Sequence, residues 1–220
     1  MRLTSQLSIA FASSLLIGCS STGWGSQVYG EGPYIDSDRS LEGFESLSMS
    51  GGMAIDITIG SPQSVVIFAE ENLHEYIRTR VVDGTLKIDF TESISTSEPV
   101  RAEITVASLE SISLSGSSKL SVNSLDEDEF ILNVSGSVRG EISGDVRDLE
   151  VNIAGSGKLK LFGLNATDAE IDISGSGNVE IAVSDSLDVD IAGSGVVTYV
   201  GTPALSTSFA GSGKVRRKDG

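Results

Sequence analysis

A short block of the form Ser/Ala-Gly-Ser recurs through the second half of the chain at almost constant spacing. The central glycines of successive blocks are 20, 19, 20, 18 and 18 residues apart. They stand at Gly116, Gly136, Gly155, Gly175, Gly193 and Gly211. A repeat this short cannot bury an apolar face by itself, so the copies must pack against one another.

Within each repeat, apolar and polar residues alternate on both sides of the glycine. Leu149, Val151 and Ile153 precede Gly155, for example, and Leu159 follows it. Alternation with a period of two is typical of a strand that is buried on one face only. The glycine block between two such strands predicts a tight corner, because glycine adopts backbone conformations closed to other residues.

These observations predict an all-β fold, a parallel β-solenoid with coils of about 18–20 residues and Gly-Ser-Gly corners. An antiparallel sandwich is the alternative, since turns at intervals of 8–12 residues are also typical of sandwiches. A hexapeptide β-helix is not favoured, because no aliphatic residue recurs at every sixth position.

The segment before the regular repeats is rich in strand patterns but lacks the tight spacing. Met49–Gly52 resembles a degenerate first corner, and Glu70–Ile77 has the pattern of one or two helical turns. Because the end of a solenoid has to be capped, an irregular beginning is expected. We therefore place one β-solenoid domain at residues 43–215, followed by a basic tail at 216–220.

The N-terminus has the features of a targeting segment. Arg2 is followed by a mostly apolar run, Leu7–Ile17, which is too short to span a bilayer. Leu16-Ile17-Gly18-Cys19 resembles the lipobox of bacterial lipoproteins. This resemblance implies a signal peptide at residues 1–18 and lipid attachment at Cys19; the alternative is an ordinary secretory signal with an incidental cysteine.

Lipid on Cys19 would make the membrane the first partner of this chain. Two or three acyl chains anchor a protein stably, whereas one does not. Ser20, after the cysteine, resembles the sorting pattern of outer-membrane lipoproteins. We expect residues 19–42, which show no sustained periodicity, to be the lipidated cysteine and a flexible tether, and the protein to be lipid-anchored in the cell envelope at the outer membrane.

Composition excludes several classes of protein. The chain of 220 residues has one Cys and one His, which excludes a disulfide framework, a cysteine-based metal cluster and a multi-histidine metal site. Its formal net charge of -16 argues against binding to nucleic acid. No cofactor is expected.

No residue pattern predicts a catalytic, cofactor or metal site. His74 lies among acidic residues, and the chain has no G-x-S-x-G elbow for a nucleophilic serine. The densest acidic cluster, Asp126–Glu129, could bind Ca²⁺ weakly but is better explained as a solvated loop. Asp172 and Asp190 occupy equivalent positions in successive repeats and predict an outward acidic ladder.

The order of motifs across about residues 41–215 resembles a known bacterial family. It begins with Leu41–Gly51 and Ile55–Gly60, continues with Val82–Ile88 and the serial glycine corners, and closes with Gly201–Ala204. This order resembles the envelope family described as "putative auto-transporter adhesin, head GIN domain". The resemblance implies a right-handed parallel β-helix in secreted or lipid-anchored proteins, and it implies no reaction.

The functional hypothesis is a lipid-anchored envelope protein that presents a non-enzymatic β-solenoid for adhesion or other envelope interactions. Its partner would be an envelope protein or a glycan. The alternative hypothesis is a carbohydrate-processing β-helix enzyme that uses a carboxylate pair.

Overall fold

The computed structural model describes residues 27–218. The predicted signal peptide and Cys19 lie outside the described residues. The fold is all-β, with a single 3₁₀ turn, η1 (Glu71–Leu73), among the described residues.

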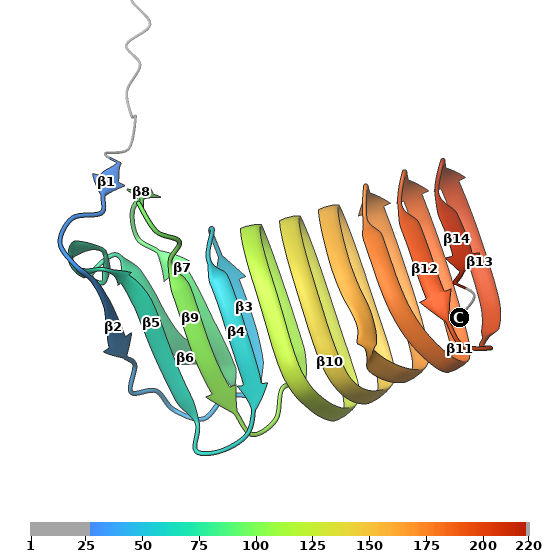
Figure 1. Ribbon diagram of the computed structural model, residues 1–220, viewed down its shortest axis with the longest axis horizontal. Coiled ribbons are helices and arrows are strands. Elements are labelled where there is room, and N and C mark those ends of the chain that lie inside the picture. Colours follow the sequence, from blue (N-terminus) through green and yellow to red (C-terminus); the bar gives the residue numbers. More distant parts are fainter. Residues whose placement is uncertain (1–26, 219–220) are drawn as a thin grey trace, which may run out of the picture.

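The strands are unequal in length. The strands of the irregular N-terminal part are β1 (Val28–Tyr29), β2 (Tyr34–Asp38), β3 (Ser46–Ser50), β4 (Ala54–Ile59), β5 (Ser64–Glu70), β6 (Ile77–Val82), β7 (Thr85–Phe90), β8 (Ile94–Ser95) and β9 (Arg101–Val106). Those of the repeats are β10 (Ser111–Gly175), β11 (Asn178–Gly193), β12 (Val196–Val200), β13 (Ala204–Gly211) and β14 (Lys214–Arg217). β10 is one extended segment that bends back repeatedly and so crosses the stack several times (Figure 1).

Successive repeats pair in parallel at the interval of the sequence repeat. Leu159 of β10 pairs with Val179 of β11, and Gly175 of β10 pairs with Gly193 of β11. β11 pairs in the same way with β12 on one side of the corner and with β13 on the other. The prediction of parallel strands is therefore confirmed for the repeats, and the antiparallel sandwich is wrong for this part of the chain.

The corner glycines lie directly above one another. All six have positive φ, between +106° and +142°. A Cβ atom on Gly155 would lie 2.5 Å from the carbonyl oxygen of Gly136. Gly51 has a φ of +122° and lies beneath Gly116 in the same column, so Met49–Gly52 does form a first corner.

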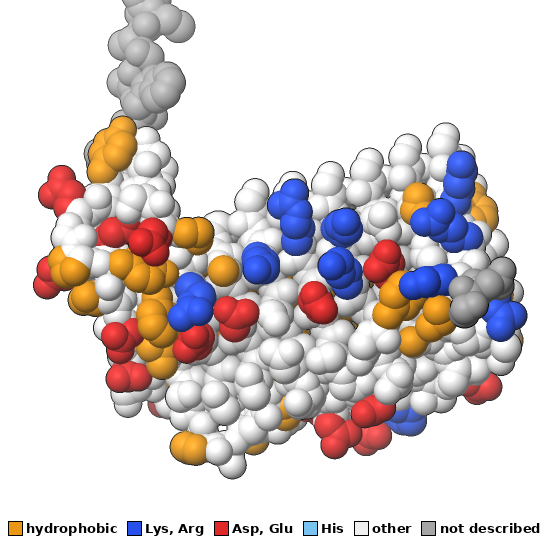
Figure 2. All heavy atoms as spheres, in the orientation of Figure 1, with side chains coloured by type: hydrophobic (Ala, Val, Ile, Leu, Met, Phe, Trp, Pro, Cys, Tyr) orange, Lys and Arg blue, Asp and Glu red, His pale blue; other side chains and the backbone are white. Residues whose placement is uncertain are grey.

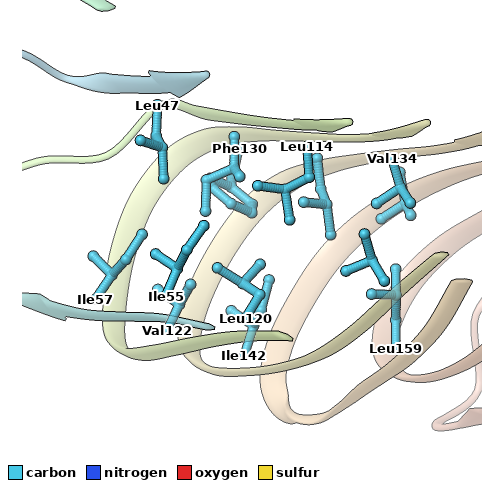
Figure 3. Close-up of a cluster of buried hydrophobic side chains, with 14 of the residues drawn as sticks. Leu47, Ile55, Ile57, Leu114, Leu120, Val122, Phe130, Val134, Ile142 and Leu159 are labelled. Atoms are coloured by element: carbon cyan, nitrogen blue, oxygen red, sulfur yellow. The ribbon is translucent and has the colours of Figure 1, made fainter. Parts of the chain in front are cut away.

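The interior between the two strands of each repeat is filled with aliphatic side chains. Figure 3 shows these side chains converging from neighbouring coils. Phe130, Leu120 and Ile142 are at most 1 % exposed. Burial of one such side chain contributes about 1.5–3 kcal/mol, so the core supplies the free energy that a single repeat lacks.

The N-terminal end is irregular because antiparallel pairs close it. β2 pairs with β5, β5 with β9, and β6 with β7, all antiparallel. The main sheet is therefore mixed, with the order β14-β12-β11-β10-β4-β9-β5-β2 over most of its width. β2, the last strand of this order, is only five residues long, and a short edge strand limits pairing with other chains.

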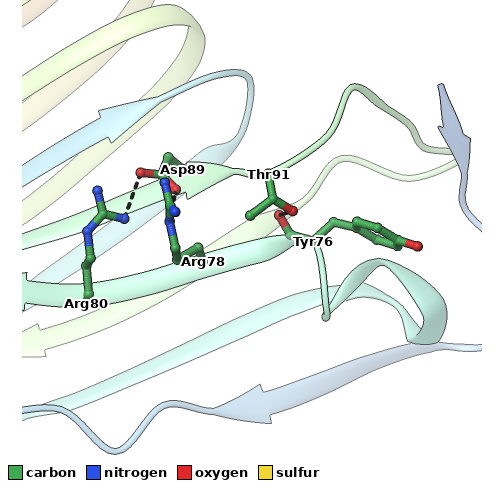
Figure 4. A network of polar contacts seen from close by, with 5 residues as sticks. All are labelled: Tyr76, Arg78, Arg80, Asp89 and Thr91. Atoms are coloured by element: carbon green, nitrogen blue, oxygen red, sulfur yellow. Dashed lines mark hydrogen bonds and ion pairs between the residues drawn. The ribbon is translucent and has the colours of Figure 1, made fainter. Parts of the chain in front are cut away.

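Ionic contacts reinforce this end of the sheet. Asp89 of β7 accepts hydrogen bonds from Arg78 Nε at 2.7 Å and from Arg80 Nη1 at 2.8 Å, both on β6 (Figure 4). The hydrogen bond from Arg78, together with Arg80, lowers the pKa of Asp89 although partial burial opposes the change.

The predicted flexible tether at residues 19–42 is wrong for its second half. β1 pairs with β8 and β2 pairs with β5, so residues 28–38 belong to the folded body. The Asn72 side chain also bonds the main chain of Tyr29 and Glu31. Alternation over five residues was too short to reveal a strand whose partner lies about 30 residues away.

Two further boundaries differ from the prediction. The helical pattern at Glu70–Ile77 yields only the 3₁₀ turn, because Ile77 is taken up by β6 as the partner of Phe90. The predicted tail at 216–220 begins too early, since Arg216 and Arg217 pair with Thr198 and Tyr199 of β12.

Among the described residues, the last coil has a neighbouring coil on one side only. Every residue of β13 is exposed, including Leu205 at 45 % and Phe209 at 47 %. These side chains occupy positions that a following coil would cover in the middle of the stack.

Gly155→Ala tests the corner column. The new methyl group would meet the Gly136 carbonyl, and alanine would also be strained at a φ of +134°. We expect the free energy of unfolding to fall by at least about 2 kcal/mol in urea denaturation. Gly43→Ala is the matched control, since no heavy atom lies within 4 Å of its added Cβ. Equal stability of the two variants would contradict the column.

Candidate functional site

The repeats present two outward surfaces, one on each side of the corner column. The strands before each corner carry serine, asparagine and acidic residues, and we call this surface the serine–acid face. The strands after each corner carry most of the exposed lysine and arginine residues of the regular repeats. Since the interior is filled with side chains, the chemistry of the repeats lies on these two surfaces.

Hydroxyl and amide side chains line up at the N-terminal end of the serine–acid face. Ser111 Oγ donates to Ser46 Oγ at 3.0 Å across β10 and β3. Asn152 Nδ2 lies 3.1 Å from Asn133 Oδ1 of the preceding coil and 2.6 Å from Glu150 Oε1. A shallow groove of about 360 Å³ runs over this region, and no aromatic side chain lines it.

Carboxylates dominate the C-terminal end of the same face. Asp172 of β10 pairs directly with Asp190 of β11, as expected for the acidic ladder. Partial burial raises the pKa of Asp172, and the negative charges of Asp190, Glu150 and Asp188 raise it further. Across residues 27–218, no group of three or more His, Cys, Asp or Glu side chains is arranged to hold a metal ion.

The acidic cluster Asp126–Glu129 does not converge on one point. Glu127 Oε1 accepts a hydrogen bond from the Leu109 amide at 2.6 Å, and Asp128 lies 3.6 Å from Arg147 Nε. These contacts join the acidic segment to residues of neighbouring coils. They do not bring its carboxylates together, so they give the weak Ca²⁺ site no support.

His74 lies just after η1 and faces the N-terminal strand β2. Its Nε2 is 3.2 Å from the Ile35 carbonyl oxygen, and Arg39 Nη2 donates to the His74 carbonyl at 3.3 Å. None of these partners is a serine or a carboxylate, so His74 has the contacts of a structural residue.

A second groove lies on the other surface, and the sequence analysis missed it. It has a volume of about 820 Å³ and is lined by four cations, Lys119, Arg139, Lys158 and Lys160. We call it the cationic groove. Three of these residues stand at the third position after a corner glycine, at Gly116, Gly136 and Gly155. That shared distance from a glycine is the sequence pattern that predicts the groove, although basic residues are few in this strongly acidic chain.

The described part of the chain holds no helix with the length and apolar character that a bilayer crossing requires.

Asp172→Asn tests the acidic ladder. The raised pKa means that ionised Asp172 opposes folding at neutral pH, and the amide removes this charge. We expect Asp172→Asn to raise the free energy of unfolding by roughly 0.2–1 kcal/mol at neutral pH. The gain should disappear at about pH 3, where the aspartate is protonated in both the folded and unfolded chain.

Urea denaturation at the two pH values measures this effect. Asp185→Asn, at an exposed position of β11 where the register with β10 is interrupted, is the control and should change stability little at either pH. A gain for Asp172→Asn that persists unchanged in acid would contradict the electrostatic origin.

Comparison with solved structures shows this fold in proteins of several bacteria. The crystal structure of a "putative adhesin" from Bacteroides fragilis matches with a TM-score of 0.69 at 20% identity, covering 87% of this chain and 100% of that one. A "putative adhesin" from Parabacteroides distasonis matches with a TM-score of 0.60 at 21% identity, covering 88% and 100%. A "putative lipid binding protein" from the same species has a TM-score of 0.54 at 20% identity and covers 88% and 100%.

No curated protein matches this chain in sequence. The family model described as "Putative auto-transporter adhesin, head GIN domain" matches residues 43–203, which is most of the chain and includes five of the six predicted corner glycines. The glycine column and the parallel repeats agree with this match, and the chain belongs to the family described as "Putative auto-transporter adhesin, head GIN domain".

Proposed function

We propose that this protein is a lipid-anchored bacterial envelope protein whose repeats form a right-handed parallel β-helix, used without catalysis for adhesion or other envelope interactions. Membership of an adhesin family supports a role at the cell envelope. Parallel pairing of successive repeats supports the β-helix. The outer membrane is the proposed location, on the basis of Ser20.

One observation carries this proposal. Equivalent residues of successive repeats lie side by side in rows on the outside, while aliphatic side chains fill the inside. Such an arrangement offers long, regular surfaces for contact with an extended partner. An envelope protein or a glycan would meet several coils at once, so that weak contacts add together.

A carbohydrate-processing enzyme has no supporting observation. Asp172 and Asp190 are close, but the groove beside Asp172 is lined by serine, asparagine, alanine and aliphatic residues. A general acid and a nucleophile would need an enclosed place for the sugar between them. The paired carboxylates instead lie near a second acidic pair, Glu170 with Asp188, two residues earlier on the same strands.

The anchor would hold the protein by its irregular end. Cys19 lies only a short segment before β1, and β1 and β2 lie at the capped end of the stack (Figure 1). Lipid on Cys19 would therefore keep that end nearest the membrane. The regular coils would remain available to partners.

Cys19→Ala tests the anchor. Cells that express the wild-type protein are labelled with a radioactive fatty acid, and the protein is recovered from the membrane fraction. We expect Cys19→Ala to lose the label and to leave the membrane fraction, because no other residue of the chain has a thiol. Ser20→Ala should keep the label. Label that persists in Cys19→Ala would overturn the anchor.

The adhesive role is tested in the same strains. Attachment to immobilised envelope material should fall when the gene is deleted and should return with the wild-type protein but not with Cys19→Ala. Unchanged attachment after deletion would contradict the adhesive role, whatever the result for lipidation.

A further inference from the structure

Three cations stand in a single row along the cationic groove. Lys119, Arg139 and Lys158 each follow a corner glycine by three residues. A Cβ atom on the neighbouring Gly140 would touch Leu120 on one side and Leu159 on the other, which places the three residues in adjacent coils. Adjacent parallel strands are about 4.8 Å apart, so the row carries one positive charge at each such step.

The charges of this row are not neutralised within the described part of the protein. Lys119, Arg139, Lys158 and Lys160 are exposed, and none of them forms an ion pair with a residue of 27–218. Two carboxylates, Glu98 and Glu141, also line the groove. Four cations and two anions thus line the groove of a chain whose net charge is -16, and Glu180 stands opposite Lys160 on the neighbouring strand.

Like charges on neighbouring strands repel one another and cost stability. An anion that bridged successive coils would relieve this repulsion. The row is thus a cationic surface on an otherwise acidic molecule, and Figure 2 shows lysine and arginine side chains over the middle of the stack.

The groove also offers hydroxyl groups and apolar surface beside the cations. Ser117 and Ser137 line it and are exposed, so their hydroxyl groups can reach a ligand. Exposed Pro99 adds apolar surface. The neighbouring Ser118 is 7 % exposed and alternates with Lys119 along the strand, so its side chain faces the interior.

We propose that the cationic groove binds an acidic polysaccharide with about one carboxylate per sugar ring. One pyranose ring advances a glycan chain by about the distance between adjacent strands, so successive carboxylates would meet Lys119, Arg139 and Lys158 in turn. The serine hydroxyls and apolar patches suit the hydroxyl groups and C–H faces of the sugars. This inference rests on the proposed surface role and gives it a ligand class.

A nucleic acid suits the groove less well. Proteins that bind single strands stack the bases on aromatic side chains, and no aromatic residue lines this groove. The acidic remainder of the chain would also repel a phosphate backbone.

Binding to polygalacturonate, with its fully methyl-esterified form as the neutral comparison, tests the proposal. The test variant is Lys119→Gln/Arg139→Gln/Lys158→Gln. The matched control is Lys214→Gln/Arg216→Gln/Lys218→Gln, which removes two cations of β14 and the lysine that follows it, at the C-terminal end of the same sheet. Circular dichroism and urea denaturation establish that both variants are folded.

We expect the wild-type protein and the control variant to bind polygalacturonate and not its ester. The test variant should bind at least tenfold more weakly. For polyanion binding, the logarithm of the binding constant falls linearly with the logarithm of salt concentration, and its slope decreases by about one per cation removed. The slope of the test variant should therefore be smaller by about three, an effect that a structural defect would not produce.

Several results would overturn the proposal. These are equal binding by the test variant, an equal loss in the control variant, equal binding of the ester, or equal binding of single-stranded DNA or anionic lipid vesicles. Because purified protein is used, the result is independent of lipidation. Unchanged cell attachment after deletion of the gene, together with polygalacturonate binding by the purified protein, would count against the adhesive role alone.

Discussion

The close approach of one backbone to the next at the glycine column is the constraint on which the rest of the structure depends. At each corner the carbonyl oxygen of one glycine occupies the space where a side chain of the next would lie. Only glycine permits both this contact and the positive φ of the corner. The column therefore aligns every coil on its neighbours, and the strands on both sides pair in parallel with equivalent residues side by side. Phe130, Leu120 and the other inward residues then stack into one core, which no single repeat could form.

Alignment of the coils has a consequence for charge. A side chain that recurs at one position of the repeat becomes a row, with its members about 4.8 Å apart. On one side of the column this rule brings Asp172 beside Asp190 and raises the pKa of Asp172. On the other side it brings together Lys119, Arg139 and Lys158. Electrostatic repulsion within each row lowers the stability of the fold, and the buried core and the main-chain hydrogen bonds offset this loss. Asp172 borders a groove of about 360 Å³, whereas the basic row lines a groove of about 820 Å³.

Much of the fold and some of the surface could be predicted from the residues. The spacing of Gly116 to Gly211 predicted parallel pairing, and equivalent positions in the repeat predicted the pairing of Asp172 with Asp190. Local patterns failed where a partner is distant in sequence. β2 needed β5 to become a strand, and the pattern at Glu70–Ile77 was overridden because Ile77 pairs with Phe90. The cationic groove was missed for a related reason, since four basic residues in a chain of net charge -16 gain significance only when their positions in the repeat are compared.

The sequence by itself determined the structure of one repeat and the stacking of its copies. A glycine that no other residue can replace, flanked by alternating aliphatic residues, allows one local structure, and its recurrence every 18–20 residues makes the copies stack. Only the tertiary structure decided how the stack is closed at its N-terminal end and which charges meet across coils. Those outcomes depend on residues far apart in the chain: Ile35 pairs with Ala69, and the groove is lined by residues as distant in sequence as Pro99 and Lys160. A periodic pattern can be read from neighbouring residues in the sequence. The N-terminal cap and the groove are formed by segments that are far apart in the sequence and meet only in the folded protein.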